Sequence, residues 1–224
     1  MNILIIIAIV LFIIGIIVMV GGAPSKGRTE DDFVNSIQKF VKGSKETIGE
    51  GKESYQINFI FEGMPFVYEK IEIKGFKEGV FNVHLKAKTN SNFNLLFSEK
   101  GQGKTVDPNR SILGVNVPEG DGGQGRVAVP KELGNFNIDT NNVGLANRLL
   151  QDKKIIQVFM KYINVDSRGY HLLTMNIKDG DVFIEFDTHG IRKPSYHALK
   201  GNVSLLEYYI DDLMVVAKKV KMLV

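Results

Sequence analysis

A stretch that shares part of the spelling of a phosphate-binding loop is the first place where the residue types suggest chemistry. Gly103, Lys104 and Thr105 match the end of the pattern Gly-x4-Gly-Lys-Ser/Thr, in which backbone N–H groups surround a phosphate at the start of a helix. The first glycine of the pattern is replaced by Ser98, and Thr105 is followed by Val-Asp-Pro, which disfavours a helix. The sequence therefore predicts a polar loop here, and nucleotide binding is not expected.

Two other segments match the beginning of a binding motif and then depart from it. Residues 120–125 spell Gly-x-Gly-x-x-Gly, the dinucleotide fingerprint, but a strand-like run follows them where the motif needs a helix. Residues 164–175 begin like a calcium loop, yet Arg168 occupies a ligand position and Met175 stands where a bidentate Glu is required. We expect neither a dinucleotide nor calcium at these segments.

The four histidines, His84, His171, His189 and His197, lack the spacing of a metal or catalytic motif. His189 and His197 share one segment with Asp187, which raises a metal or acid–base site as an alternative, but loop placement favours solvent-exposed histidines. The chain has no cysteine, which excludes disulfides and thiolate chemistry. The sequence thus assigns no catalytic residue, no cofactor and no metal ligand, and predicts a protein that is not an enzyme.

Lysines on the expected strands form the one surface feature with a functional interpretation. A basic sheet face would attract anionic lipid headgroups or an acidic partner, although lysines also keep exposed strands from aggregating. The total of 28 Lys and Arg against 25 Asp and Glu is too even to predict nucleic-acid binding. The residues of this basic sheet face are Lys70, Lys74, Lys86, Lys88 and Lys178, and a second candidate interaction surface in the loop comprises Lys100, Lys104 and Arg110.

An apolar run at the N-terminus decides the expected location of the protein. Residues 3–20 contain no charge and would span about 27 Å as a helix, close to the thickness of a bilayer core. A cleaved signal peptide is the alternative, but the run has no basic residue before it, it is too long, and Pro24 would lie at the cleavage site. We interpret the run as a single transmembrane helix that remains as an anchor.

The basic residues that follow this helix, such as Lys26 and Arg28, favour a cytoplasmic location for the rest of the chain. The opposite, extracytoplasmic topology is the alternative, because large domains can be translocated against flanking charge. A short amphipathic helix follows the anchor, with Thr29 and Asp32 as a capping box and Gly43 as its end. We expect its apolar face to pack on the domain rather than to lie on the membrane surface.

Alternation of apolar and polar residues predicts an antiparallel sheet in the remaining chain. Four strands form a meander, with Ile71 and Ile73 buried and Lys70 exposed on the second strand. Asp179-Gly180 predicts a later hairpin with a type I′ turn. The four meander strands are expected near residues 55–62, 70–74, 81–88 and 93–97, with a further short strand at 126–130.

Helical spacing of apolar residues predicts two more helical regions. One broken helix or two consecutive helices cover residues 142–163, and a long helix begins near Asn202 with Ser204 and Glu207 as its capping box. Clustered strands followed by helices indicate an α+β fold with a mainly antiparallel sheet, four meander strands and a later hairpin, packed by helices that include the long C-terminal one.

The expected organisation has three parts: a transmembrane anchor and hinge at residues 1–23, a juxtamembrane amphipathic helix and linker at 24–52, and one soluble α+β domain at 53–224. From it we predict a single-pass membrane protein whose soluble domain binds or scaffolds a membrane-associated protein partner. The alternatives are a module that binds lipid or a small ligand at the membrane surface, and an enzyme whose site forms no recognisable motif.

Overall fold

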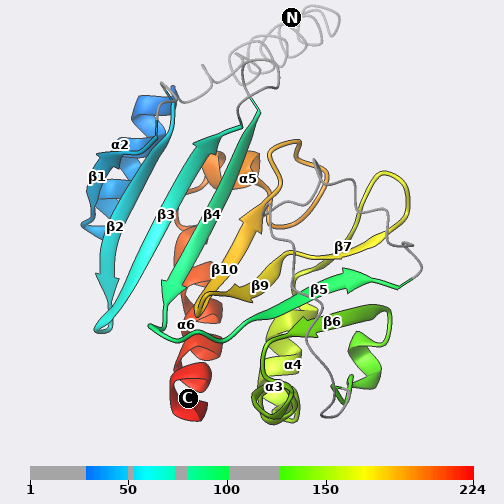
Figure 1. Cartoon of the computed structure of the whole chain (residues 1–224). Helices are drawn as coiled ribbons and strands as arrows, with labels where there is room; N and C mark the ends of the chain where they lie inside the picture. Colours follow the sequence, from blue (N-terminus) through cyan, green and yellow to red (C-terminus); the bar gives the residue numbers. More distant parts are fainter. Residues whose placement is uncertain (1–28, 50–52, 74–79, 101–126) are drawn as a thin grey trace, which may run out of the picture. The chain divides into compact units, whose positions relative to one another are not determined.

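The computed structural model of this chain describes residues 29–49, 53–73, 80–100 and 127–224 (Figure 1). The predicted transmembrane helix, the glycine-rich motifs, Lys74, Lys104 and Arg110 lie outside the described residues. Within the described ranges, no helix has both the length and the apolar content needed to cross a membrane. The chain divides into two compact units, Met1–Ser36 and Ile37–Val224.

Helix α2 (Glu30–Val41) begins as predicted, with the hydroxyl of Thr29 accepting a hydrogen bond from the backbone N–H of Asp32 at 3.2 Å. The helix ends at Val41, two residues before the predicted stop at Gly43, and Lys42 adopts the left-handed conformation. Gly43 is needed for another reason: a Cβ atom there would lie 2.8 Å from the carbonyl oxygen of Asn58. The glycine therefore allows the chain to approach the neighbouring strand closely.

One antiparallel sheet of eight strands forms the centre of the unit Ile37–Val224, in the order β1-β2-β3-β4-β10-β9-β5-β6 (Figure 1). A separate pair, β7 (Ile163–Val165) and β8 (His171–Leu173), forms a small second sheet. The strands of the large sheet are β1 (Ser44–Thr47), β2 (Tyr55–Phe61), β3 (Met64–Glu72), β4 (Phe81–Lys88), β5 (Leu95–Glu99), β6 (Phe136–Thr140), β9 (Met175–Lys178) and β10 (Asp181–Phe186).

The meander prediction is correct for β2, β3 and β4 but wrong for the fourth strand. The hairpin β9–β10 lies between β4 and β5, so that β5 pairs with β9 and β6 instead of β4. The connection from β4 to β5 passes the hairpin turn, where the backbone N–H of Gly180 donates to the carbonyl of Phe93 at 3.0 Å. Asp179 and Gly180 both have positive φ, as the predicted type I′ turn requires.

The expected faces of β3 are reversed in the structure. Lys70 pairs with Val83 and lies on the apolar face of the sheet, where only 2% of it is exposed, whereas Ile71 is 37% exposed on the other face. The strand begins at Met64, and counting alternation from there places Phe66, Tyr68 and Lys70 on one face. The short run that begins at Lys70, taken alone, indicates the opposite parity because Ile71 and Ile73 are its apolar residues.

Helices α3 to α6 all lie on one face of the sheet, behind it in Figure 1. Phe186 of β10 contacts Tyr209 of α6, and Phe97 of β5 contacts Phe159 of α4, with ring centroids 5.2 and 5.1 Å apart. These contacts close the main apolar core. The helices of this unit are η1 (Lys131–Leu133), α3 (Val143–Leu150), α4 (Lys153–Met160), α5 (Tyr196–Gly201) and α6 (Leu205–Leu223).

The predicted helical region near residues 142–163 forms two helices, α3 and α4, capped by the side chains of Asn142 and Asp152. The predicted strand at 126–130 is wrong, because residues 127–130 are irregular and the backbone N–H of Ala128 donates to the Asn147 side chain at 2.7 Å. Asn147 of α3 thus takes a donor that a strand would need for its ladder.

The buried stripe of α6 is confirmed, but its predicted capping box is not formed. Ser204 already has helical backbone angles, and its hydroxyl donates to the Asn202 side chain at 2.7 Å instead of accepting from the helix. An N-cap side chain needs an extended backbone to reach the first turn, which explains the difference. The residues of the confirmed stripe are Leu206, Ile210, Leu213, Ala217 and Val220.

Candidate functional site

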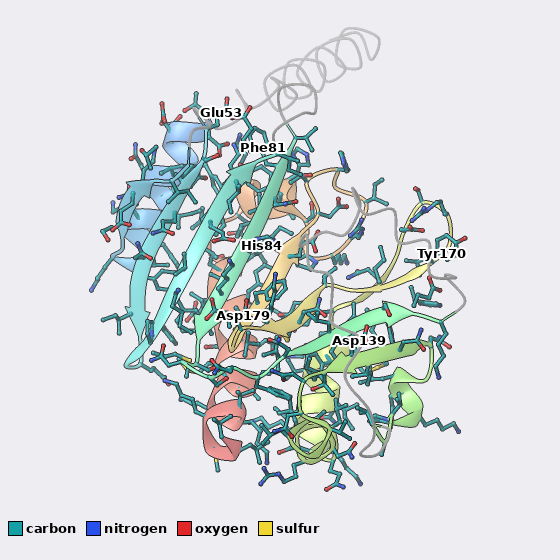
Figure 2. All side chains as sticks on the ribbon, viewed as in Figure 1. Glu53, Phe81, His84, Asp139, Tyr170 and Asp179 are labelled. Atoms are coloured by element: carbon teal, nitrogen blue, oxygen red, sulfur yellow. The ribbon has the colours of Figure 1, made fainter. Side chains whose placement is uncertain are left out.

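Three ionisable side chains form a row across neighbouring strands on the sheet face that faces away from α3 to α6. Glu69 of β3 pairs with His84 of β4, and His84 pairs with Glu185 of β10. Directly paired residues of antiparallel strands point to the same face. Figure 2 labels His84 near the middle of the sheet, so the row crosses its central strands.

Glu69 is the most strongly bonded member of this row. Its Oε1 lies 2.9 Å from Nδ1 of His84 and 2.6 Å from Nζ of Lys86, although only 9% of the Glu69 side chain is exposed. Burial tends to raise the pKa of Glu69, but the hydrogen bonds from His84 and Lys86 outweigh it and lower this pKa. Glu69 is therefore held as a carboxylate, and in a neutral imidazole the Nδ1 hydrogen is the one that it accepts.

The other ring nitrogen of His84 is different. Nε2 is buried without a hydrogen-bond partner among the described residues, and the side chain is 5% exposed. A buried polar atom left without a partner costs about 1 to 3 kcal/mol. The ring packs edge-to-face on Phe183, with centroids 5.5 Å apart. Since Glu69 takes Nδ1, Nε2 is the nitrogen that remains for a ligand.

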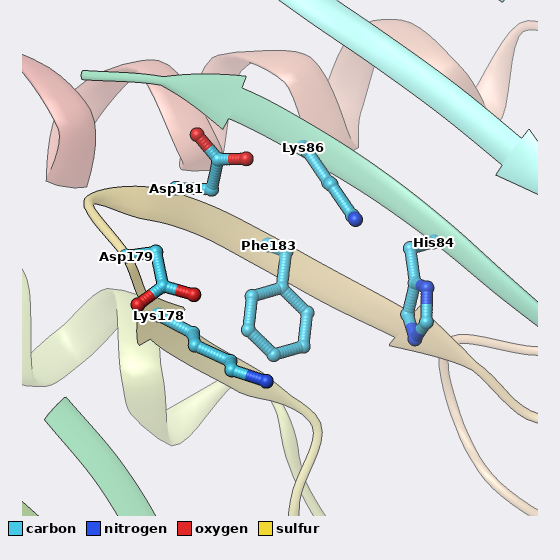
Figure 3. A pocket seen from close by; sticks show the side chains of 6 residues that line it. All are labelled: His84, Lys86, Lys178, Asp179, Asp181 and Phe183. Carbon is cyan, nitrogen blue, oxygen red and sulfur yellow. The ribbon is translucent and has the colours of Figure 1, made fainter. Parts of the chain in front are cut away.

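A cavity of about 160 Å³ opens beside this histidine (Figure 3). In Figure 3 the ring of Phe183 lies between His84 and Lys178, and the ammonium group of Lys86 points toward the space beside both rings. The two acidic residues of the lining stand nearer the hairpin turn. The lining consists of His84, Lys86, Lys178, Asp179, Asp181 and Phe183.

The carboxyl groups of this face differ in the direction of their pKa shifts. Burial raises the pKa of Asp181, and the charges of Lys88 and Lys86 oppose this shift. Nζ of Lys88 lies 3.9 Å from Oδ2 of Asp181. Burial also raises the pKa of Glu185, which the charges of His84 and Arg192 counteract only in part. A bound cation or hydrogen-bond donor near Glu185 would therefore favour its ionised form.

Three of the lysines predicted to form a basic sheet face do share this face. Lys88 and Lys178 each pair with Asp181, and Lys86 pairs with Phe183, so all three lie on this face, and Lys86 and Lys178 line the cavity. The assignment of Lys70 to this face is wrong. It lies on the opposite, helix-covered face, where its Nζ is 3.3 Å from Glu53 and 3.9 Å from the centroid of the Phe81 ring.

The loop surface is represented in the structure by Lys100 alone. This residue is exposed just after β5, and its backbone N–H donates to Asn135 at 2.9 Å. Lys104 and Arg110, which complete the predicted surface, are outside the described ranges, as is Lys74 of the basic face. The loop interaction therefore stays a prediction.

The other segments considered for chemistry are used to shape loops. Asp187 accepts hydrogen bonds from the backbone N–H groups of His189, Ile191 and Arg192 at 3.0, 2.6 and 2.6 Å, which commits its carboxylate to the loop. Asp166 is bonded to the backbone and side chain of Arg168. In the described part of the chain, no group of three or more His, Cys, Asp or Glu residues is arranged to hold a metal ion.

Sequence reasoning did not find the pair of Glu69 and His84. Both residues occupy polar positions of alternating strands, and their signal was the correct parity of β3, which places Glu69 on the same face as His84. Comparison with protein-family models, with curated proteins and with solved structures finds no match for this chain.

Proposed function

We propose that the domain is a binding module that holds a small molecule in the cavity beside His84. The observation that carries this proposal is the buried Nε2 of His84, which has no partner among the described residues and belongs to a ring that lines the cavity. A ligand that bonds to Nε2 would remove the cost of that unpaired atom. The proposal develops the ligand-binding alternative of the sequence analysis.

The lining of the cavity is more charged than that of a typical small-molecule site, but it combines the two kinds of contact that such a site uses. An aromatic ring, Phe183, provides apolar contact area, and a few charged or polar groups converge on the same space. The pair of Glu69 and His84 also resembles the arrangement in which a carboxylate orients a catalytic histidine. The described lining contains no Ser, Thr or Cys that Nε2 would activate, which favours binding over covalent catalysis.

The test uses the full-length protein in mild detergent and the ring ¹⁵N signals of its four histidines. Single-ring fragments with neutral, anionic and cationic substituents are titrated one at a time. At least one class is expected to shift the His84 signals in a saturable way while those of exposed His189 stay constant. If no class shifts His84, or if every histidine shifts alike, the proposal fails.

Membrane attachment belongs to the same proposal and is supported by the uncharged apolar run at residues 3–20. A tethered module with its ligand site near the bilayer would also suit a membrane-associated partner. Because the chain has no cysteine, single cysteines at exposed Ser98 and Ser204 would report the topology without background. Ser54 is unsuitable because it is 5% exposed. Labelling in intact cells by an impermeant reagent would overturn the cytoplasmic location.

A further inference from the structure

The lining of the cavity narrows the class of ligand, provided that the proposed binding function holds. We propose that the cavity binds a single hydroxylated aromatic ring whose weakly acidic O–H donates to Nε2 of His84. Four features of the site support this ligand class: the size of the cavity, its two rings, the unpartnered Nε2 of His84 and the ammonium groups in the lining.

Size limits the ligand to about one ring. The cavity measures about 160 Å³, and a cavity of about 150 Å³ in another protein accommodates benzene. Phe183 and His84 offer two ring surfaces at 83° to each other. A flat aromatic ligand would contact both, because aromatic rings prefer offset or edge-to-face neighbours.

The hydrogen-bonding character of His84 selects a donor. In a neutral imidazole the hydrogen lies on Nδ1, which is 2.9 Å from the carboxylate of Glu69, so Nε2 then carries a lone pair and no hydrogen. A hydroxyl group satisfies this nitrogen as a donor, whereas an ether or a carbonyl oxygen leaves it unpaired. Glu185, the partner of His84 on β10, cannot serve this role within the described structure, because no hydrogen bond joins it to Nε2.

The cations select an acidic hydroxyl. In Figure 3 the ammonium groups of Lys86 and Lys178 lie on the side of the cavity near Phe183 and His84, while Asp179 and Asp181 stand toward the hairpin turn. Negative charge that develops on the ligand oxygen during donation to Nε2 is stabilised by nearby ammonium groups. A phenol can donate to Nε2 and is acidic enough for the ammonium groups to stabilise the charge on its oxygen. An aliphatic alcohol is much less acidic, so the ammonium groups stabilise it much less.

The probe is 4-nitrophenol, because its phenolate absorbs visible light and its phenol does not. Titration of the full-length protein at pH 7 is expected to give a saturable increase in phenolate absorbance beyond that of the free probe, because the O–H bond of the bound phenol breaks and its proton passes to Nε2 of His84. The imidazolium formed in this way stays paired with Glu69 through Nδ1. The matched compound 4-nitroanisole lacks the O–H and is expected to bind at least about tenfold more weakly, the effect of about one lost hydrogen bond to a charged or polarised partner. This comparison needs no substitution and cannot be confounded by misfolding.

Variants locate the effect. H84F is expected to abolish the absorbance change, with H189A as the matched control at an exposed histidine. K178Q is expected to reduce the bound phenolate fraction, with K153Q as the control for an exposed lysine on a helix behind the sheet. Each variant is first shown to unfold cooperatively.

The outcomes separate the two proposals. If fragments shift the His84 ring signals but 4-nitrophenol gives no saturable change, or binds no better than 4-nitroanisole, the ligand class is wrong and the binding function stands. If 4-nitrophenol binds H84F as well as the wild type, the inference is overturned. If neither the fragments nor 4-nitrophenol affect His84, both proposals fail.

Discussion

The contact that joins α4 to α6 allows a quantitative test of the core. Asp212 is 5% exposed, and its two oxygens accept from Nζ of Lys161 at 2.6 Å and from the hydroxyl of Tyr162 at 3.0 Å. Asp212→Ala would leave the buried phenol without an acceptor, which costs about 1 to 3 kcal/mol. Lys161 has a side chain that is 42% exposed and would return to water, so the lost ion pair adds at most about 1 kcal/mol.

The expected loss for Asp212→Ala is therefore about 1 to 4 kcal/mol in the free energy of unfolding, most of it from the phenol. Asp212→Asn keeps an acceptor oxygen for Tyr162 and should lose about 1 kcal/mol or less. Tyr162→Phe removes the donor and leaves the carboxylate with Lys161, so about 1 kcal/mol is expected. Lys161→Gln should have the smallest effect of the series.

Urea unfolding of the full-length variants followed by circular dichroism measures these differences. Asp211→Ala is the matched control, because Asp211 is the exposed neighbour on the same helix. It reports the gain of roughly 0.5 kcal/mol that alanine brings to a helix, which is subtracted from the result for Asp212→Ala. The reasoning is refuted if Asp212→Asn or Lys161→Gln costs as much as Asp212→Ala, because the ion pair would then dominate.

Three further predictions use the same unfolding assay. Gly180→Ala should destabilise the fold by more than Gly63→Ala, because its new Cβ would clash with the backbone of Ser91. Gly63 has open space around it, so Gly63→Ala has only the cost of positive φ, about 1 to 2 kcal/mol, and equal losses would contradict this prediction. Burial raises the pKa of Glu185, so the protonated carboxyl group contributes fully to stability below about pH 4.3, and this contribution is lost as the pH rises through the folded-state pKa. Glu185→Gln should therefore stabilise the protein at pH 7 but not at pH 3. Burial and the nearby carboxylate of Asp212 raise the pKa of Tyr162. Stability should therefore fall above about pH 10, where the unfolded chain releases the phenol proton and the folded chain does not. Tyr162→Phe should weaken this pH dependence.

Local signals predicted the parts of the fold that local chemistry decides. The Asp179-Gly180 turn formed as expected because few residue pairs tolerate positive φ at two successive positions. The register that it sets places Ile177 opposite Val182, on the buried face. The stripe of α6 is also predicted, since its apolar spacing repeats over about four turns.

The order of strands depended on contacts that no local pattern contains. Alternation near residues 93–97 correctly indicated a strand, yet nothing within that run distinguishes β4 from β9 as its neighbour. The neighbour of β5 is decided by the segment after β4, where Thr89 and Phe93 form hydrogen bonds with Gly180 of the distant hairpin turn. A connection of six residues between β4 and β5 is long enough to pass two inserted strands, whereas a tight turn would have forced direct pairing.

The candidate site was missed for a related reason. Its central pair, Glu69 and His84, requires both the correct parity of β3 and the pairing of β3 with β4, and the sequence supported only the pairing. Parity failed at Lys70, a charged residue that is buried because Glu53 and the Phe81 ring satisfy it. If every lysine is assumed to be exposed, the two faces of β3 are assigned the wrong way round. The inversion moves Glu69 to the wrong face, and with it the carboxylate that fixes the hydrogen on Nδ1 of His84. A buried lysine on one face therefore concealed the polar cluster on the other.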